Sequence, residues 1–472
     1  MLQVGVYRSD VNPPLDLPHA GWGAQTHVWA EGCEGDLTVA ALYLTDGSRE
    51  AMVLDFDLGV IYPPEVGAIR EGVAEATGVP AEAVRVCVTH NHAGAQMEYD
   101  YYGLGQGARR AYVASLVDKG VGVAQEARRR ARPARFAAGS GECRFAMNRR
   151  QRLPSGRVVT GADPVGPTDP QVQVCRFDAE DGSPLAAIFT YTAHPTTLGP
   201  GNRFLSPDYP GYAKQVFARI TGATPLFMQG PAGNVGPGRD GFTADVAVHR
   251  RNGAMLACEA AKVFLSLDTR PGRLVFDRTV ESGAPLGYFR RESGPQVEIT
   301  IDTLTQEISL PVREHIPVRE AEAIAAGAAG RLKALRDGRA DDDQVAAATF
   351  EAKRAAMLVE RCHMYHGLEQ QTIEAHLLRI GDLVFAGVPL EPFVQIGLEV
   401  KRRSPYPATF FGGYTNGTLA YLPIAEAYAE GGYEVDTTPF APEAAANAVA
   451  GTLAGIERLH ARQLDMEGSS VR

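Results

Sequence analysis

The sequence predicts a single large α/β domain in which mixed β-sheets are flanked by helices and joined by long loops. Three observations predict this fold class. Strand-like apolar segments alternate with helix-like segments along the chain. Apolar residues make up 45% and charged residues 22% of the 472 residues, as in soluble globular proteins. The 51 glycines and 31 prolines exceed the usual combined share of roughly 12%, which predicts a loop-rich fold.

In the N-terminal half, turn and helix-end residues separate the predicted elements. Asp46-Gly47 is a typical hairpin turn, and Gly78 is placed to end a helix. In chain order we expect a strand and loop over 4–14, a hairpin over 36–59, a helix over 64–77, a buried strand over 84–88, a helix over about 108–131, two strands around Asp181-Gly182, and helices near 209–220 and 243–266.

The C-terminal half predicts a β-rich stretch followed by exposed helices. We expect strands within 273–315, two helices within 317–361 around an acidic turn, two strands over 370–381 and 382–390, and a final helix over about 442–461. No internal repeat or linker is evident. We therefore expect one domain over 1–465, with an insertion or subdomain over 270–345 and a polar tail over 466–472.

Composition argues against several classes of protein and partner. The formal net charge of −10 disfavours nucleic acid as the main partner. No apolar run approaches the ~20 residues that span a bilayer. The chain opens on a strand-like LQVGVY without a signal-peptide pattern, so we expect a cytoplasmic protein with a small-molecule substrate. The six cysteines are irregularly spaced, which predicts reduced thiols, and no pattern predicts an oligomeric state.

The sharpest local motif is Thr89-His90-Asn91-His92-Ala93-Gly94, at the end of an apolar strand. Residues i and i+2 of an extended chain point to the same side, so the two imidazoles can share a metal. Alternatively, one imidazole binds the metal while the other carries protons. Two ordinary polar loop histidines would give the same pattern.

Two further strands end on a potential ligand, His194 after AAIFTYTA and Glu391 after LVFAGVP. Open α/β sheets place their sites at such strand ends, and zinc accepts both imidazole nitrogen and carboxylate oxygen. A lone histidine there is more often a hydrogen-bonded structural residue. The competing cluster Cys362-His363-Met364-Tyr365-His366 reads as the C-terminus of a helix, where histidine complements the dipole.

The loop Gly230-Pro231-Ala232-Gly233-Asn234-Val235-Gly236-Pro237 is glycine-rich but lacks the lysine of a nucleotide-binding P-loop. Because glycine has no side chain, its backbone can approach a ligand closely. We therefore expect Gly233, Asn234 and Gly236 to bind substrate.

Together these motifs resemble the N-terminal catalytic domain of the neutral/alkaline ceramidase family. The order of the motifs, from residue 4 to about 460, is the family's order. They are THNHAG, FTYTAHP, the helix start at Ser206 and Asp208, the segment from Phe227 to Val235, and the spacing of Asn416, Tyr421, Glu426, Tyr428, Tyr433 and Glu434. Five motifs in one order make a chance match improbable.

The resemblance implies one zinc ion per chain, held by His90, His194, Glu391 and Tyr421. It also implies that His92, Arg149 and Tyr433 surround the scissile carbonyl. In the family, zinc activates water for attack on an amide. His92 would carry protons, and Arg149 and Tyr433 would donate hydrogen bonds to the developing oxyanion.

The sequence departs from the family pattern at Gly236, where ceramidases carry a serine, and at Pro231, where they carry asparagine. It also has no recognisable secretion signal or C-terminal immunoglobulin-like domain. From these differences we expect a zinc-dependent hydrolase of an amide (N-acyl) bond in a smaller, more polar substrate than ceramide. The alternatives are an ester, lactone or glycoside hydrolase with the same metal centre, and a non-catalytic metal-containing binding protein.

Overall fold

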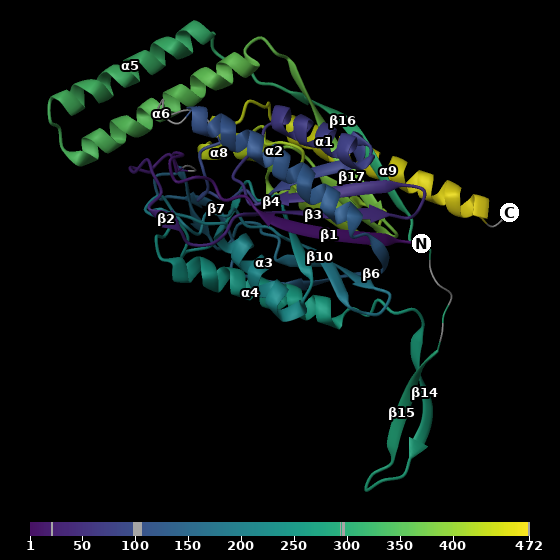
Figure 1. Ribbon diagram of the computed structural model, residues 1–472. Helices are drawn as coiled ribbons and strands as arrows, with labels where there is room; N and C mark the ends of the chain where they lie inside the picture. The colour runs from purple at the N-terminus through teal and green to yellow at the C-terminus, as the bar shows by residue number, and fades with distance from the viewer. Residues whose placement is uncertain (20–21, 98–105, 293, 295–297, 471–472) are drawn as a thin grey trace.

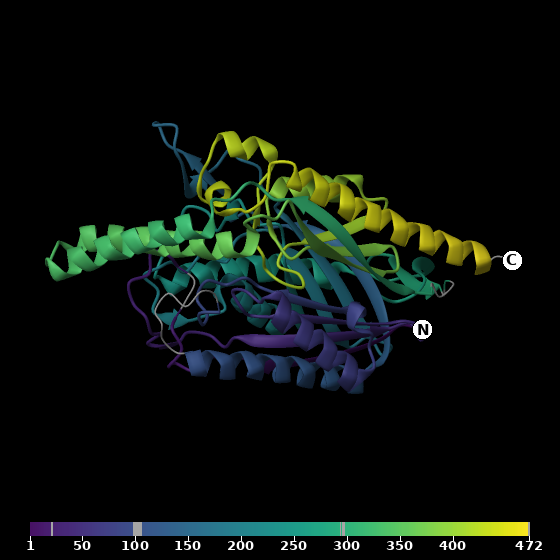
Figure 2. The ribbon, with the colours of Figure 1, turned by 90° about the horizontal axis from the view of Figure 1, so that it is seen from above.

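Two β-sheets stack face to face, and helices cover both outer faces, which gives four layers (Figures 1 and 2). The computed structural model describes residues 1–19, 22–97, 106–292, 294 and 298–470. The predicted class, mixed sheets flanked by helices, is confirmed. Most of the buried apolar side chains lie in the three interfaces between these layers.

The larger sheet has eight strands in the order β12-β10-β9-β6-β1-β3-β4-β5. Only the outermost pairs, β10 with β12 and β4 with β5, are parallel. In sheet order the strands comprise Thr224–Gln229, Pro184–Tyr191, Gln171–Ala179, Arg132–Glu142, Gln3–Asp10, Thr38–Thr45, Glu50–Phe56 and Val84–Val88. The hairpin predicted at Asp46-Gly47 is β3–β4, and the predicted buried strand is β5.

The smaller sheet has the order β16-β17-β18-β20, with strands Ile301–Pro311, Gln370–Ile380, Leu383–Gly387 and Ala408–Gly412. Strand side chains alternate between faces, and both faces of this sheet are buried. In β18, Leu383 and Phe385 pack against the larger sheet, whereas Val384 and Ala386 pack against helices. Because side chains on both faces of β18 are buried, its sequence is a continuous run of apolar residues.

Helices α1 (Pro63–Thr77), α2 (Gln106–Arg129), α3 (Asp208–Thr221) and α4 (Val246–Ser266) cover the outer face of the larger sheet. Helices α7 (Val394–Arg403) and α9 (Ala444–Ser470) cover the smaller sheet. Helix α1 ends as predicted, because Gly78 adopts φ 77° and its amide caps the last turn. Helix α9 continues to Ser470 through most of the expected polar tail, and residues 471–472 lie outside the described residues.

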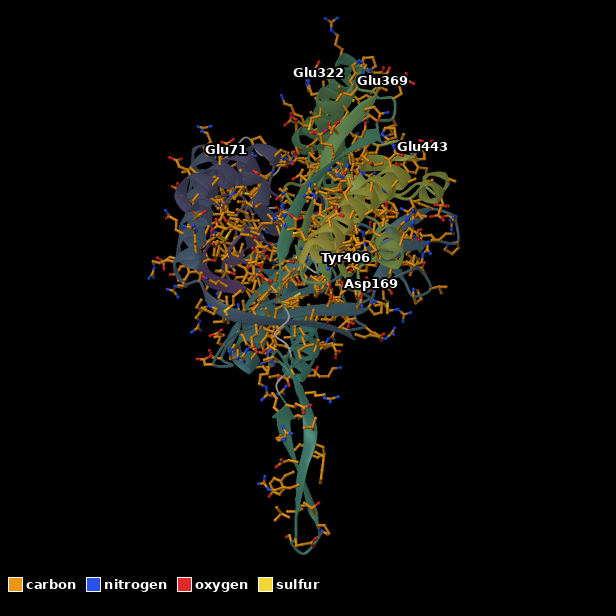
Figure 3. All side chains as sticks on the ribbon, turned by 90° about the vertical axis from the view of Figure 1, so that its right-hand side faces the viewer. Glu71, Asp169, Glu322, Glu369, Tyr406 and Glu443 are labelled. Carbon is orange, nitrogen blue, oxygen red and sulfur yellow. The ribbon has the colours of Figure 1, made fainter. Side chains whose placement is uncertain are left out.

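Two hairpins project from this body (Figures 1 and 3). One consists of the helices α5 (Val318–Asp337) and α6 (Asp342–Tyr365), as predicted around the acidic turn. The other consists of β14 (Arg273–Val280) and β15 (Leu286–Glu292). The segment 270–345 is therefore not one separate body, since β16 lies between the hairpins in the chain and pairs with β17 inside the smaller sheet.

The remaining short elements connect the larger ones. They are β2 (Gly32–Cys33) with β11 (Phe204–Leu205), β7 (Met147–Arg152) with β8 (Val158–Asp163) and β13 (Val235–Gly236), β19 (Glu391–Pro392) with β21 (Tyr421–Leu422), the 3-10 turns η1 (Ala81–Ala83) and η2 (Ala425–Ala429), and α8 (Tyr433–Thr437). Within the described chain, none of the helices is both long and apolar enough to cross a bilayer.

Candidate metal centre and its pocket

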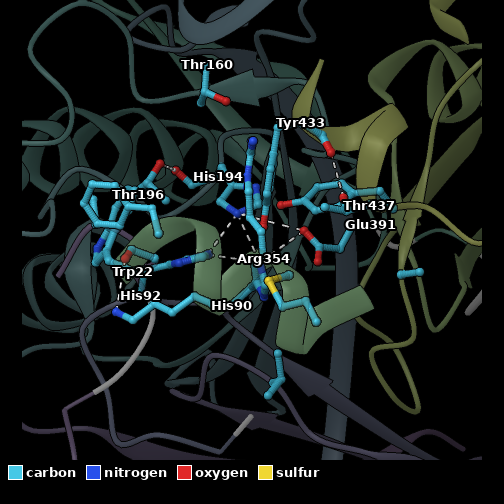
Figure 4. A pocket seen from close by; sticks show the side chains of 18 of the residues that line it. Trp22, His90, His92, Thr160, His194, Thr196, Arg354, Glu391, Tyr433 and Thr437 are labelled. Carbon is cyan, nitrogen blue, oxygen red and sulfur yellow. Dashed lines mark hydrogen bonds and ion pairs between the residues drawn. The ribbon is translucent and has the colours of Figure 1, made fainter. Parts of the chain in front are cut away.

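The predicted metal ligands and catalytic residues line one pocket near the C-terminal ends of β5, β10 and β18 (Figure 4). Backbone hydrogen bonds join the sheets at this edge: the Val88 amide donates to the Tyr414 carbonyl (3.3 Å) and the Asn416 amide to the Val86 carbonyl (2.7 Å). His90 has φ 62°, a left-handed conformation that costs a residue with a side chain on the order of 1–3 kcal/mol. The surrounding structure therefore holds His90 in a strained position at the site.

Three imidazole nitrogens converge at this edge. The Nε2 atoms of His90 and His194 lie 3.1 Å apart, those of His92 and His90 3.3 Å, and those of His92 and His194 3.0 Å. Nitrogen ligands bound about 2.0–2.1 Å from a tetrahedral zinc are separated by roughly 3.3 Å. The spacing of the three histidines therefore fits one metal ion, and together they form a group that could hold one.

The tautomers of two of these histidines strengthen the fit. His90 Nδ1 lies 2.6 Å from the Gly59 carbonyl oxygen and His194 Nδ1 lies 3.3 Å from the Ala232 carbonyl oxygen. A carbonyl only accepts, so each Nδ1 carries a proton and each Nε2 is the nitrogen that faces the cluster. Burial, and then the charge of Arg149, lowers the pKa of His194 well below its ordinary value, so this ring is neutral. The short contact between the Nε2 atoms of His90 and His194 therefore needs a proton or a metal ion between them.

A carboxylate completes the cluster. Glu391 Oε2 lies 3.3 Å from His90 Nε2 and 3.9 Å from His194 Nε2. Burial alone would raise the pKa of Glu391, but the facing His90 and Arg149 outweigh burial and lower it. Glu391 is therefore an anion beside the three nitrogens, as a ligand to a divalent metal must be.

Tyr414 supports this cluster and was missed from the sequence. Its ring stacks on His90 at 4.2 Å between centroids, and its hydroxyl donates to Glu391 Oε2 at 3.4 Å. It lies two residues after the end of β20 and adopts φ 54°. The only sequence signal was its place in a tyrosine-rich segment at the end of a strand, which does not distinguish it from its neighbours.

Tyr421, the predicted fourth ligand, lies beside the cluster in the pocket wall. Its ring is nearly parallel to that of His194, with centroids 6.4 Å apart, and the guanidinium of Arg149 lies over it at 5.4 Å. Burial, and then the charge of Glu391, raises the pKa of Tyr421 well above its ordinary value. The phenol is thus neutral, and ligation would require a cation to displace its proton.

Arg149 is held by a buried carboxylate. Its Nε donates to Glu434 Oε1 at 2.9 Å, and Glu434 Oε2 accepts from Arg150 Nη1 at 2.9 Å. Arg149 Nη2 is buried and has no hydrogen-bond partner among the described residues, although Arg149 lines the pocket. A buried donor without a partner is costly, and a ligand oxygen would satisfy it. Tyr433 begins α8 and lines the same pocket.

The loop residues predicted to bind substrate are not among the residues that line the pocket. A side chain on Gly233 would meet the Glu391 carbonyl oxygen at 2.5 Å, so this glycine lets the loop pack against β19. Asn234 accepts from the Val394 amide at 2.8 Å and donates to Gln395 at 2.9 Å. Gly236 packs against the Arg149 side chain. This geometry supports the metal site from behind and does not support a direct contact with substrate.

The pocket above the cluster has a volume of about 680 Å³, which suits a small organic ligand. Besides the site residues it is lined by apolar and aromatic side chains, chiefly Trp22, Val60, Tyr62, Phe242 and Leu419, and by one face of α6. His19 also lines it, and burial lowers the pKa of His19 to about 4. Sequence reasoning missed these walls, because no local pattern links the pocket-lining residues of α6 to His90 and His194, which lie more than 150 residues earlier in the chain.

No protein-family model matches the chain. Related sequences and related solved structures both agree with the predicted resemblance. The chain is 24% identical over 451 residues to a neutral ceramidase of Pseudomonas aeruginosa, covering 84% of this chain and 62% of that protein. It is 25% identical over 399 residues to a neutral ceramidase of Mycobacterium tuberculosis, covering 75% and 60%. The chain thus spans about three-fifths of the length of these relatives.

Solved structures show the same fold. The neutral ceramidase structure from Pseudomonas aeruginosa superposes with a TM-score of 0.69 at 20% identity, covering 97% of this chain and 75% of that one. A ceramidase complexed with C2 superposes with a TM-score of 0.68 at 18% identity, covering 98% and 75%. The predicted resemblance to the neutral ceramidase family is confirmed.

Proposed function

We propose that this relative of the neutral ceramidases is a zinc-dependent hydrolase that cleaves an N-acyl amide bond of a small substrate. The observation that carries the proposal is the convergence of three imidazole nitrogens and an anionic carboxylate below the pocket. Held there by His90, His194 and Glu391, with Tyr421 as the fourth ligand, a zinc ion would polarise a carbonyl and acidify water.

The chain's own residues supply the other functions that amide hydrolysis needs. Arg149 Nη2 is placed to donate to the oxygen that becomes negative in the transition state, and Glu434 holds its guanidinium in position. Tyr433 is the second expected donor from the same wall. One such donor accounts for about 10²–10³ in kcat in other oxyanion sites.

His92 is the proton carrier in this proposal. It is only half-buried, whereas His90 and His194 are fully buried, so it lies nearer the pocket. Its ring packs against Trp22 at 5.3 Å between centroids. Its Nε2 is close enough to the other two to serve as a third ligand instead. The metal content of a His92→Gln variant distinguishes these roles: a proton carrier leaves it near one ion per chain, and a ligand does not.

The test is elemental analysis of the purified protein combined with a hydrolysis screen, with and without chelator. We expect about one zinc per chain and chelator-sensitive hydrolysis of N-acyl amides. His194→Gln should lose both metal and activity, whereas His249→Gln, which changes a buried histidine outside the pocket, should keep its metal. Full metal content in His194→Gln would show that the ligand set is wrong.

The same metal centre suits other electrophiles, so the screen includes esters, lactones and glycosides. Turnover of one of these without amide hydrolysis would assign the site to that bond. Metal binding without turnover of any substrate would favour a non-catalytic binding protein. A cytoplasmic location remains a prediction from the sequence.

A further inference from the structure

We infer that the substrate of this site carries an oxyanion, such as a carboxylate, which Arg354 and Arg157 bind at the exposed side of the pocket. The inference rests on the proposed amide hydrolysis and specifies its substrate class. Four basic side chains line the pocket, and only two acidic ones do so; they are Arg149, Arg157, Lys353 and Arg354 against Glu351 and Glu391.

Both acidic side chains already have cationic or histidine partners. Glu391 faces His90 in the metal cluster. Glu351 forms an ion pair with Arg331 of α5, across the helical hairpin. Neither carboxylate forms an ion pair with Arg354 or Arg157 among the described residues.

Arg354 and Arg157 are exposed, and neither guanidinium has a hydrogen-bond or ion-pair partner among the residues that the structure describes. They approach from different elements: Arg354 lies on α6, and Arg157 precedes β8. Lys353, the other basic residue of the rim, donates to the Gly23 carbonyl at 3.1 Å and the Gln25 carbonyl at 3.2 Å. A planar guanidinium binds carboxylate, sulfonate or phosphate through paired hydrogen bonds.

Helix α6 combines this charge with an apolar surface. Ala347, Phe350, Arg354 and Met357 follow helical spacing, so they share one face, and all four line the pocket. Figure 4 labels Arg354 among the residues around the histidine cluster. The walls thus offer apolar contact for an acyl chain and two free cations for an anion. An N-acyl amino acid combines both features with the scissile amide. Its hydrolysis breaks the C–N bond, joins the water oxygen to the acyl carbon and leaves a protonated amino acid.

The test compares kcat/KM for N-dodecanoylglycine with that for its neutral analogue N-dodecanoylglycinamide. N-dodecanoyltaurine and N-dodecanoylphosphoethanolamine distinguish carboxylate from sulfonate and phosphate. We expect the wild type to favour an anionic substrate at least about tenfold. Arg354→Gln and Arg157→Gln should each reduce this ratio severalfold. Arg336→Gln, which removes the same charge from α5 outside the pocket, should keep it.

A wild type that prefers the neutral amide, or an anion preference that survives in the double variant, would overturn the inference. If no amide is hydrolysed, the proposed function fails separately. In that case, calorimetry measures how tightly N-dodecanoylglycine and its amide bind to the zinc-loaded protein, which tests the anion site without turnover. Tighter binding of the carboxylate that is lost in Arg354→Gln supports the anion site, and equal binding overturns it.

A different observation concerns the β14–β15 arm, the hairpin that projects from the body (Figures 1 and 3). Six large apolar side chains on it are exposed: Leu274 62%, Phe276 58%, Val280 38%, Leu286 46%, Tyr288 45% and Phe289 63%. They lie on both faces, because Phe276 pairs with Phe289, whereas Tyr288, the residue before Phe289 in β15, points to the opposite face. An isolated two-stranded hairpin is at best marginally stable in water.

We propose that a second copy of this chain covers these side chains in a two-fold dimer, with its arm against one face of this arm and its body against the other. An aromatic side chain has about 150–250 Å² of surface that can be buried. Six half-exposed apolar residues therefore expose on the order of 600 Å² of apolar surface per arm. Two arms together reach roughly 1,200 Å², the lower bound for a specific interface. The turn 281–285, with exposed Glu281, Ser282 and Gly283, is polar, which does not suit insertion of the tip into a membrane.

Light scattering with size-exclusion chromatography tests the dimer. The wild type should be dimeric at micromolar concentration, and Phe276→Ser with Phe289→Ser should be monomeric with an unchanged far-UV spectrum. Thr279→Ser, a change on the same hairpin that keeps its apolar residues, should remain dimeric. A monomeric wild type, or a dimer that survives the double substitution, overturns the proposal. A monomeric wild type that floats with phosphatidylcholine vesicles would assign the arm to membranes instead.

Discussion

Glu434→Gln should disconnect the proposed oxyanion donor from its support without touching the metal ligands. Glu434 is 2% exposed, and each of its carboxylate oxygens accepts a 2.9 Å hydrogen bond from a different arginine. A glutamine amide keeps one accepting oxygen, and its NH₂ group would face a second donor. Arg150 retains other partners, since its Nη2 also donates to the Gly431 carbonyl at 2.7 Å and to Glu430 at 3.2 Å. Arg149 would lose the carboxylate that accepts its Nε hydrogen bond.

The expected magnitudes follow from this geometry. Removing one partner from a buried ion pair costs about 3–5 kcal/mol, because a buried charge is left uncompensated. Misplacing one oxyanion donor costs about 10²–10³ in kcat. Because Glu434 supports a donor and does not line the pocket itself, KM should change much less than kcat.

Chemical denaturation and steady-state hydrolysis of an N-acyl amide measure the two effects. The matched control is Glu430→Gln, which pairs with Arg150 and Arg152 but is far more exposed, its side chain being 41% accessible. That exposure predicts a change of under about 1 kcal/mol and little effect on rate. If Glu434→Gln matches this control in stability and rate, the supporting role of Glu434 is refuted.

Three further outcomes follow from other contacts. Lys214→Met should lower the free energy of unfolding by about 3–5 kcal/mol, because Lys214 neutralises two buried aspartates at 2.8 and 2.9 Å; an unchanged denaturation midpoint would contradict this. Gly233→Ala should cost about 1–3 kcal/mol and weaken metal binding, measured by titration, since its Cβ would lie 2.5 Å from a backbone oxygen of the metal-site strand. Burial opposes ionisation of Glu34, but the facing His249 and Arg250 outweigh it and lower its pKa to about 2. The folded pKa lies below the unfolded value of about 4.3, so Glu34 stabilises the fold above that pH and loses this contribution as the pH falls towards 2. In acid-unfolding measurements, the free energy of unfolding of Glu34→Gln should therefore fall less between about pH 4 and pH 2 than that of the wild type.

The elements that the sequence predicted well have strong local signals. The β3–β4 hairpin has an Asp-Gly turn between alternating apolar strands, and Gly78 stops α1 through a left-handed conformation. The end of α9 was placed too early, because a polar composition after residue 465 does not by itself break a helix. The loop at Gly233 was expected to bind substrate because a glycine allows close approach to any group, whether ligand or backbone. The tertiary structure places the β19 backbone there.

By itself, the sequence determined the strands and the polar side chain that ends each of them. His90, His194 and Glu391 could be selected because a strand ending on a potential ligand is a local pattern. Only the tertiary structure decided which other groups reach these side chains: Tyr414 against His90 and Glu391, Glu434 against Arg149, and α6 above the pocket. The physical reason is that these partners meet through the packing of two sheets and a projecting hairpin. Contacts between residues so far apart in the chain leave no periodicity or spacing in the sequence.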